Sequence, residues 1–259
     1  MNRSAAGQQP LLVATCLATC LAAIPGLGGE MSRLPVGFVH LREIDQTIVQ
    51  DIRYAGAENF TGAPVRGYQA SECILLREAA EALKLVQDDL RPRGLSLKVY
   101  DCYRPVQAVK AFIQWVQKPA GPGVGRYWPR THLGDLVKLG YIAANSIHST
   151  GAAVDVTIVA LPFSQNDSFD SRVAYPACNA ASTAREPDNS LDMGTSFDCF
   201  DEMSHTASSE ITAEQRENRR LLVDAMLARS FKNYFREWWH FTYVGLPQLP
   251  KAQDFVITK

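Results

Sequence analysis

The alternation of hydrophobic and polar residues divides this chain into a small number of regular elements. Residues 71–90 carry apolar side chains at helical spacing, and a proline and a glycine follow, so the pattern predicts a helix with one buried face. Alternating patterns predict strands over residues 47–54 and 95–103. A mostly apolar run over residues 152–161 predicts a further, buried strand.

The same pattern predicts two more helices and a last strand. A proline opens the predicted helix over residues 105–117, a position where proline is tolerated. The predicted helix over residues 212–230 begins with a capping box, Thr212 and Gln215, in which each side chain can serve an unpaired backbone N–H. Residues 236–245, REWWHFTYVG, resemble a buried strand. Helices and strands are grouped unevenly, so we expect an α+β domain rather than a doubly wound sheet.

Residues 162–190 interrupt this pattern. The segment is rich in Ser, Asn, Asp and Ala with little periodicity, and an insertion of that length is usually a lid, a binding loop or a disordered stretch. The chain shows no internal repeat. We therefore expect a single domain over residues 30–259 that contains one irregular insertion loop.

The first 29 residues differ from the rest of the sequence. Arg3 is followed by an apolar run over residues 10–24 and then by the helix-breaking segment PGLGGE. This layout is typical of a secretory signal peptide, and the run is too short for a stable membrane anchor. We expect an exported, periplasmic protein whose mature form has no membrane span. A cytoplasmic protein is the alternative, and Cys20 is a poor match to a lipoprotein cleavage site because Thr19 precedes it.

Composition and charge narrow the class of partner. With 259 residues, 46% of them hydrophobic and 20% charged, the chain can bury an ordinary globular core. Its 26 basic and 27 acidic residues leave a formal net charge of −1, and no cluster of Lys and Arg stands out that would follow a phosphate backbone. Nucleic acid is therefore not an expected partner.

Four cysteines would remain after removal of the leader, namely Cys73, Cys102, Cys178 and Cys199. An even number of cysteines in an exported chain permits two disulfides, for which three pairings are possible. We prefer Cys178 with Cys199, which would close an irregular loop, and Cys73 with Cys102, which would tie a helix to the next strand. Four buried free thiols are the alternative.

Candidate chemistry begins in the stretch SIHSTGAAVDVTIV, where His148 and Asp155 are seven residues apart. In an unbroken strand an odd separation sends two side chains to opposite faces, and on a helix seven residues separate them by about 10 Å along the axis. The two can share one ion only if the chain bends between them. Gly151 lies where such a bend could fall, because glycine accepts backbone angles closed to other residues.

A third ligand is suggested by the segment EWWH. It places Glu237 and His240 three residues apart in an apolar setting, where a buried carboxylate needs a partner. His148, Asp155 and His240 would form a set of two histidines and one carboxylate, the pattern of catalytic zinc with one position left open. Glu237 would then act as the general base. Taken singly these signals are weak, since a lone histidine is more often a core or surface residue.

Four ordered motifs change this assessment. SIHSTGAAVD matches the Ser-x-His-x-x-Gly-x-Ala-x-Asp signature of the zinc D,D-peptidases, and REWWH matches their Glu-x-Trp-His signature. DIRYAGAENFTGAPVRGY and VYDCYRPVQA narrow the resemblance to the VanX-type D-alanyl-D-alanine dipeptidases, and MGTSFDCFDEMSH is also similar to that group. The resemblance covers roughly residues 41–241.

The resemblance implies a fold, a cofactor and a role for each matching residue. The fold would be hedgehog-like, with a central, mainly antiparallel sheet and flanking helices, and would bind one Zn²⁺ per chain. The implied roles are zinc ligands for His148, Asp155 and His240, general base for Glu237, oxyanion stabilisation for Arg104, recognition of the substrate ammonium group for Asp198, and a place near the substrate for Ser146.

The implied activity is hydrolysis of the dipeptide D-Ala-D-Ala, a small-molecule substrate. An exported enzyme fits recycling of peptidoglycan fragments better than glycopeptide resistance, in which related enzymes act in the cytoplasm. A D,D-carboxypeptidase or endopeptidase that acts on longer stem peptides is one alternative. A non-catalytic zinc-binding recognition module is another, although the presence of Glu237 argues against it.

Overall fold

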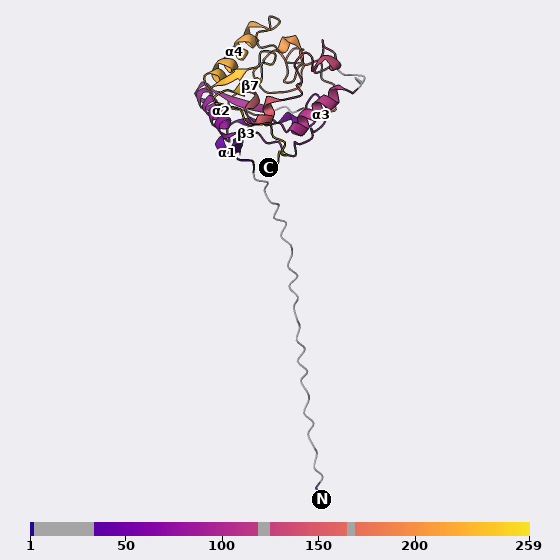
Figure 1. The fold of residues 1–259 in the computed structure, drawn as a ribbon, viewed down its shortest axis with the longest axis vertical. Helices are drawn as coiled ribbons and strands as arrows, with labels where there is room; N and C mark the ends of the chain where they lie inside the picture. Colours follow the sequence, from indigo (N-terminus) through magenta and orange to yellow (C-terminus); the bar gives the residue numbers. More distant parts are fainter. Residues whose placement is uncertain (3–33, 119–124, 165–168) are drawn as a thin grey trace. The chain divides into compact units, whose positions relative to one another are not determined.

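The computed structural model describes residues 1–2, 34–118, 125–164 and 169–259, and those from residue 34 onward form one compact unit (Figure 1). Its centre is a five-stranded sheet in the order β2-β4-β5-β7-β6. These strands are β2 (Val49–Gln50), β4 (Leu95–Asp101), β5 (Ala153–Ala160), β7 (His240–Tyr243) and β6 (Phe231–Asn233). Only β2 and β4 pair in parallel, so the sheet is mainly antiparallel, as expected. The hedgehog-like arrangement stays a prediction.

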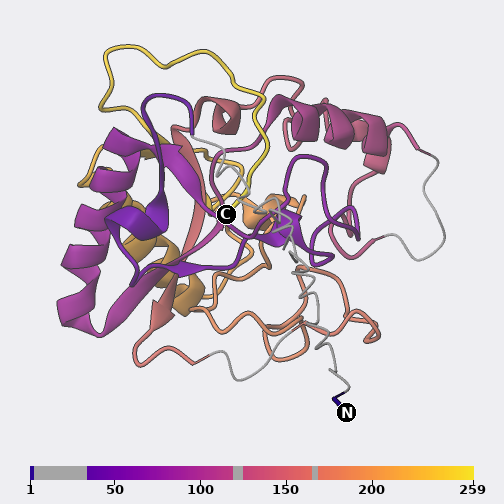
Figure 2. The same cartoon turned by 90° about the horizontal axis from the view of Figure 1, so that it is seen from below.

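Helices and a second pair of strands surround this sheet. The helices are α1 (Leu41–Ile44), α2 (Arg77–Leu90), α3 (Val106–Val116) and α4 (Ala213–Leu227), and β1 (Phe38–His40) pairs antiparallel with β3 (Ile74–Leu76). Helices α2 and α4 lie side by side, in contact with β4 and β6 respectively. Helix α3 lies apart from them, as Figure 2 shows.

The prediction of a helix over residues 71–90 was wrong for the first six residues. Ile74–Leu76 form strand β3, and only Arg77–Leu90 are helical. All three residues of β3 are buried and pair with β1, a strand that the sequence pattern did not indicate. A short apolar run fits a helix or a strand equally well, and pairing with a distant segment decides between them. The strand predicted over residues 47–54 is likewise reduced to β2, and a 3-10 helix follows it.

Other local predictions agree with the structure. Strands β4 and β5 lie within the predicted ranges. Helix α4 begins at the predicted capping box, in which the side chains and backbone N–H groups of Thr212 and Gln215 exchange hydrogen bonds. The last strand begins later than predicted, because only His240–Tyr243 of the segment REWWHFTYVG pair in the sheet. Glu237 therefore lies in the turn before β7.

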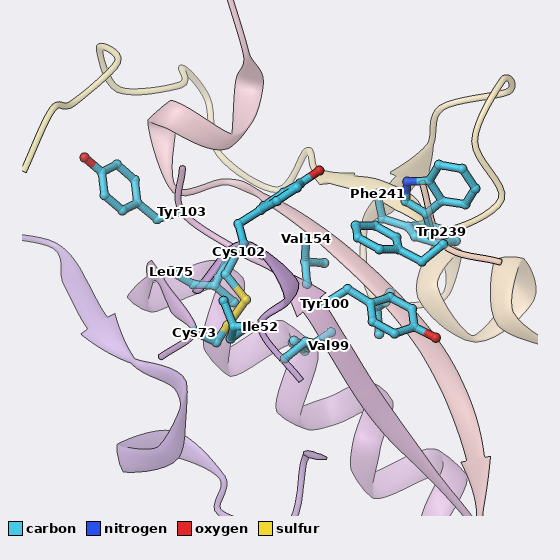
Figure 3. Packing of buried hydrophobic residues seen from close by; sticks show 14 of the residues in the cluster. Ile52, Cys73, Leu75, Val99, Tyr100, Cys102, Tyr103, Val154, Trp239 and Phe241 are labelled. Carbon is cyan, nitrogen blue, oxygen red and sulfur yellow. A yellow bond between two sulfur atoms is a disulfide. The ribbon is translucent and has the colours of Figure 1, made fainter. Parts of the chain in front are cut away.

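The core packs around β4, β5 and the two tryptophans before β7, with Val99, Val154 and Trp239 buried together (Figure 3). Both preferred disulfides are present, Cys73–Cys102 and Cys178–Cys199. Residues 162–190, as far as they are described, contain neither helix nor strand. No helix within the described residues is long and apolar enough to span a membrane. The leader predicted for residues 1–29 lies outside them, apart from its first two residues.

Candidate active site

Strand register brings Asp155 and His240 together. Asp155 on β5 lies directly opposite His240 on β7. On the other side of β5, Asp155 is opposite Asp101 of β4, next to a register shift between Val99 and Asp101. Residues directly opposite each other in neighbouring strands have their side chains on the same face of the sheet. Three strands therefore present Asp101, Asp155 and His240 in one row.

His148 reaches this row because the chain bends between it and Asp155. A 3-10 helix, Ile147–Thr150, ends at Gly151, whose φ of 77° lies in the left-handed region. A Cβ atom at this position would lie 2.3 Å from the ring of Phe38, so no larger residue fits without movement. The bend expected at Gly151 is confirmed, and it turns His148 back toward the start of β5.

Three potential ligand atoms converge at this point. His148 Nε2 lies 3.0 Å from His240 Nδ1 and 3.3 Å from Asp155 Oδ1, and His240 Nδ1 lies 3.1 Å from the same oxygen. Two ligands about 2.0–2.1 Å from a tetrahedral ion are roughly 3.3–3.4 Å apart. The observed separations of 3.0–3.3 Å are at most a few tenths of an ångström shorter, so the three donors can hold a zinc ion after a small outward movement. No other set of three His, Cys, Asp or Glu side chains converges in this way within the described ranges.

The protonation of the two imidazoles also suits a metal. His148 Nδ1 lies 2.7 Å from the carbonyl oxygen of Cys102, which can only accept a hydrogen bond, so Nδ1 carries the proton and the lone pair is on Nε2. Burial lowers the pKa of His240, which favours its neutral, ligating form. Burial alone would raise the pKa of Asp155, but the two histidines hold it below its usual range.

Glu237 lies beside the three donor atoms without belonging to their set. One of its carboxylate oxygens is 3.9 Å from His240 Nδ1, and the residue is 8% exposed. Burial raises the pKa of Glu237 well above its ordinary value, and the nearby Asp155 and Asp198 raise it further. A carboxyl group that holds a proton readily is suited to proton transfer.

Arg104 is held beside Asp101 and Asp155 by contacts with acids and with aromatic rings. Its Nε donates a hydrogen bond of 2.9 Å to Asp101, and its terminal nitrogen lies 3.5 Å from Asp155. The guanidinium also lies over the rings of Tyr54 and Phe112, at 5.1 and 5.2 Å from their centroids. A planar donor held in this way keeps a constant orientation toward the cavity.

Asp198 is buried on the irregular segment between residues 191 and 205. Its carboxylate accepts hydrogen bonds of 2.9 and 3.1 Å from the hydroxyl of Tyr54, and its φ of 59° is uncommon for a residue other than glycine. Burial raises the pKa of Asp198, and Asp155 raises it further. The disulfide Cys178–Cys199 holds the next residue in the chain.

Arg219 on α4 holds both sides of this segment. It is buried, and its guanidinium donates hydrogen bonds of 2.6–2.9 Å to the carbonyl oxygens of Met193, Met203 and His205. Burial lowers the pKa of Arg219 to about 10, so the group remains charged at neutral pH. The segment therefore keeps its shape through side-chain contacts rather than through strand pairing.

Ser146 lies at the start of the bend. Its hydroxyl accepts a hydrogen bond of 3.3 Å from the backbone N–H of His148, so it caps the 3-10 helix, and the residue also lines the cavity. The capping contact explains why a serine stands here. A contact between Ser146 and the substrate stays a prediction.

One cavity of about 250 Å³ connects these groups. The three potential ligands, Glu237, Arg104 and Asp198 all line it. Its aromatic wall consists of Tyr54, Phe60, Phe112, Tyr141, Phe200, Tyr234 and Trp239. The volume is at the small end for ligand sites, which suits a molecule of dipeptide size.

Acidic side chains outnumber basic ones at this site. Asp101, Asp155, Asp198 and Glu237 are all buried, and Arg104 is the only Arg or Lys among the described residues that line the cavity. Buried charges are normally paired or coordinate a metal. A divalent metal together with an ammonium group would supply partners for the ionised forms of these acids, which burial otherwise disfavours.

Three residues that complete the site were not identified from the sequence. Tyr54 holds Asp198 and lies under Arg104, Asp101 holds Arg104, and the hydroxyl of Tyr68 donates a hydrogen bond of 2.7 Å to Asp101. All three lie inside the motifs DIRYAGAENFTGAPVRGY and VYDCYRPVQA. The motifs could therefore have identified these residues as part of the site, whereas the hydrophobic pattern could not.

Comparisons with known proteins give matches over most of the chain. The family described as D-ala-D-ala dipeptidase (Peptidase_M15) matches residues 35–162 and 164–256. The chain is 32% identical over 225 residues to a D-alanyl-D-alanine dipeptidase of Enterococcus faecium, which covers 86% of this chain and 100% of that protein. It is 32% identical over 221 residues to a protein of the same name from Streptomyces coelicolor, which covers 85% of this chain and 98% of the relative. A protein of that name from Escherichia coli is 28% identical over 205 residues, with 79% of this chain and 80% of the relative covered.

Proposed function

Because the chain belongs to the D-Ala-D-Ala dipeptidase family of metallopeptidases, we propose that it uses zinc to hydrolyse the dipeptide D-Ala-D-Ala to two molecules of D-alanine. One observation carries this proposal. Three potential zinc ligands, with their donor atoms 3.0–3.3 Å apart, share one cavity with two further buried acids, Glu237 and Asp198. A structural zinc site would have no need of these acids or of the cavity.

The protein residues would divide the reaction among them. His148, Asp155 and His240 would hold zinc, which supplies a Lewis acid that polarises a carbonyl group and lowers the pKa of water. Glu237 takes a proton from the attacking water and passes it to the leaving amine. Arg104 donates hydrogen bonds to the carbonyl oxygen as negative charge develops there, and Asp101 keeps its guanidinium in place.

Asp198 is proposed to select a free amino terminus. Its buried carboxylate would pair with the substrate ammonium group, while the hydroxyl of Tyr54 fixes its orientation. An acylated nitrogen carries no positive charge, so a longer stem peptide would leave this carboxylate buried without a partner. The small cavity and this acid together favour a dipeptidase over a carboxypeptidase that acts on longer peptides.

The test of the base is the substitution Glu237→Gln, which keeps the size of the side chain. The variant should bind one zinc ion per chain with unchanged affinity and lose at least about a hundredfold in kcat, the usual contribution of general acid–base catalysis. Glu81→Gln, at an exposed position on α2, is the matched control and should behave as the wild type. Unchanged turnover in Glu237→Gln would refute the assigned role.

Substrate choice is tested with the wild-type enzyme. D-Ala-D-Ala should be hydrolysed rapidly, and an N-acylated D-Ala-D-Ala peptide should be nearly inert. Comparable rates on the two would identify a D,D-carboxypeptidase instead. A protein that binds zinc but hydrolyses neither substrate would be a recognition module.

We also propose that the protein is exported and acts on dipeptide outside the cytoplasmic membrane, in recycling of peptidoglycan fragments rather than in glycopeptide resistance. The two disulfides support this location, because disulfides persist in oxidising compartments. The family match also begins at residue 35, after the predicted leader. Determination of the N-terminus of the mature protein tests the proposal, and an uncleaved chain in the cytosol would contradict it.

A further inference from the structure

The carbonyl oxygen of Cys102 determines how His148 presents its ring. It accepts the 2.7 Å hydrogen bond from Nδ1, and this contact leaves the lone pair of Nε2 directed at His240 and Asp155. The second nitrogen of a metal-binding histidine is normally held by such an acceptor, which fixes both the tautomer and the ring orientation. The position of Cys102 therefore matters for His148 as a ligand.

Cys102 itself lies outside the sheet. Strand β4 ends at Asp101, where its pairing with β5 also ends, so no ladder bond to β5 holds the next residue. The disulfide to Cys73 is a covalent connection at Cys102 itself, whereas the next two residues are held by backbone hydrogen bonds, Tyr103 to Ile74 and Arg104 to His148. Figure 3 shows this disulfide among buried apolar side chains such as Leu75 and Val99.

Cys73 is a fixed point to which Cys102 is tied. Its backbone N–H donates a hydrogen bond of 2.8 Å to the side chain of Gln50, and its carbonyl oxygen accepts one of 2.9 Å from the backbone of Leu41. The next residue in the chain, Ile74, begins β3 and accepts a hydrogen bond from the backbone of Tyr103. The disulfide thus links the residue that follows β4 to the residue that precedes β3.

We infer that the Cys73–Cys102 disulfide is a positioning element for the metal ligand His148, through the carbonyl oxygen of Cys102. Oxidation of this pair would then increase zinc affinity as well as the stability of the fold. This inference rests on the proposed zinc site. It adds to that site a dependence on the redox state of two residues that touch neither metal nor substrate.

The second disulfide provides a matched comparison within the same chain. Cys178–Cys199 is also buried and also lies next to a site residue, Asp198. No hydrogen bond in the described part of the chain connects either of its cysteines to a metal ligand. Its removal should therefore affect substrate binding and leave zinc affinity unchanged.

The experiment compares two double variants, Cys73→Ala/Cys102→Ala and Cys178→Ala/Cys199→Ala. Zinc dissociation constants are measured by competition with a chromophoric chelator, and visible spectra of the Co²⁺-substituted proteins report the ligand geometry. The first variant should bind zinc about tenfold more weakly and show a changed Co²⁺ spectrum, the magnitude expected when a partner of a metal-bound histidine is disturbed. The second should match the wild type in both and show a raised KM. Equal zinc affinity in the two variants would overturn the inference.

A measurement on the wild-type protein keeps the inference testable if the first variant does not fold. Nitrogen-15 NMR of the metal-free protein should show His148 with its proton on Nδ1, and a proton on Nε2 would overturn the inference. The proposed function fails in a different way. A wild-type protein that binds no zinc would refute the zinc site, whereas one that binds zinc equally well with and without Cys73–Cys102 would refute only the positioning role.

Discussion

The proposed metal ligands and the proposed acceptor of the substrate ammonium line one cavity, yet different kinds of chain carry them. Asp155 and His240 lie on paired strands in the middle of the sheet, and their mutual position follows from strand register. Asp198 lies on a segment that contains no strand or α-helix, and one disulfide and the buried Arg219 hold this segment in shape.

This difference matches the precision that each task requires. A zinc ion accepts ligands within a few tenths of an ångström, and backbone hydrogen bonds on both sides of β5 set that geometry. Recognition of an ammonium group tolerates more variation, because a charge attracts over a longer range than a coordinate bond. An irregular segment can also change in length and sequence without disturbing the sheet. The two regions should therefore be separable by mutation.

The largest effect is expected from Asp155→Asn. The amide is a poor zinc ligand, so the variant should lose stoichiometric zinc, and kcat/KM should fall by roughly three orders of magnitude or more. Metal analysis after dialysis and turnover of D-Ala-D-Ala are the measurements. Asp89→Asn, at an exposed ion pair with Arg229, is the control. A variant that keeps both zinc and activity would exclude Asp155 from the ligand set.

A smaller effect is expected from Asp198→Asn. Loss of the carboxylate should reduce kcat/KM for the free dipeptide by about a hundredfold, the cost of leaving an ammonium group without its charged partner. Zinc affinity should be unchanged, because Asp198 is not among the convergent donors. The two regions would not be separate if this variant lost zinc to the same extent as Asp155→Asn.

The smallest effect on activity is expected from Asp188→Asn. Asp188 in the insertion is anchored to β4 by Lys98, and it also accepts hydrogen bonds from Arg53 and Tyr100. The ring of Tyr100 stacks on Phe197, next to Asp198. The substitution should raise KM only a few-fold, leave zinc affinity unchanged, and lower the free energy of unfolding by about 2 kcal/mol, less than for a fully buried ion pair.

The pH dependence of this stability loss has a defined sign. Burial alone would raise the pKa of Asp188, but Lys98 and Arg53 hold it below its usual value. A depressed carboxyl pKa stabilises the folded state at neutral pH, and this stabilisation is lost as the pH falls below about 4. Urea unfolding of wild type and variant should show a difference that shrinks on acidification. A constant difference would mean that the charge of Asp188 is not the cause.

Local sequence features determined much of the fold and the identity of the candidate ligands. The capping box at Thr212 and Gln215 predicted the start of α4, and Gly151 predicted the bend that turns His148 back toward Asp155. These two predictions succeeded because helix capping and a left-handed backbone angle depend on residues close in sequence. The segment EWWH suggested Glu237 as the base, and the family resemblance supplied Arg104 and Asp198 with their implied roles, which periodicity could not.

Only the tertiary structure decided which distant groups meet. Three such contacts could not be predicted from the sequence. Asp101 accepts a hydrogen bond from Arg104, and Asp198 accepts one from Tyr54. The carbonyl oxygen of Cys102 accepts one from His148 and orients its ring. Strand β3 was missed for the same reason, since a short apolar run becomes a strand only when a partner pairs with it. Periodicity records which face of an element is buried, whereas strand register and disulfide pairing between remote segments set which side chains touch.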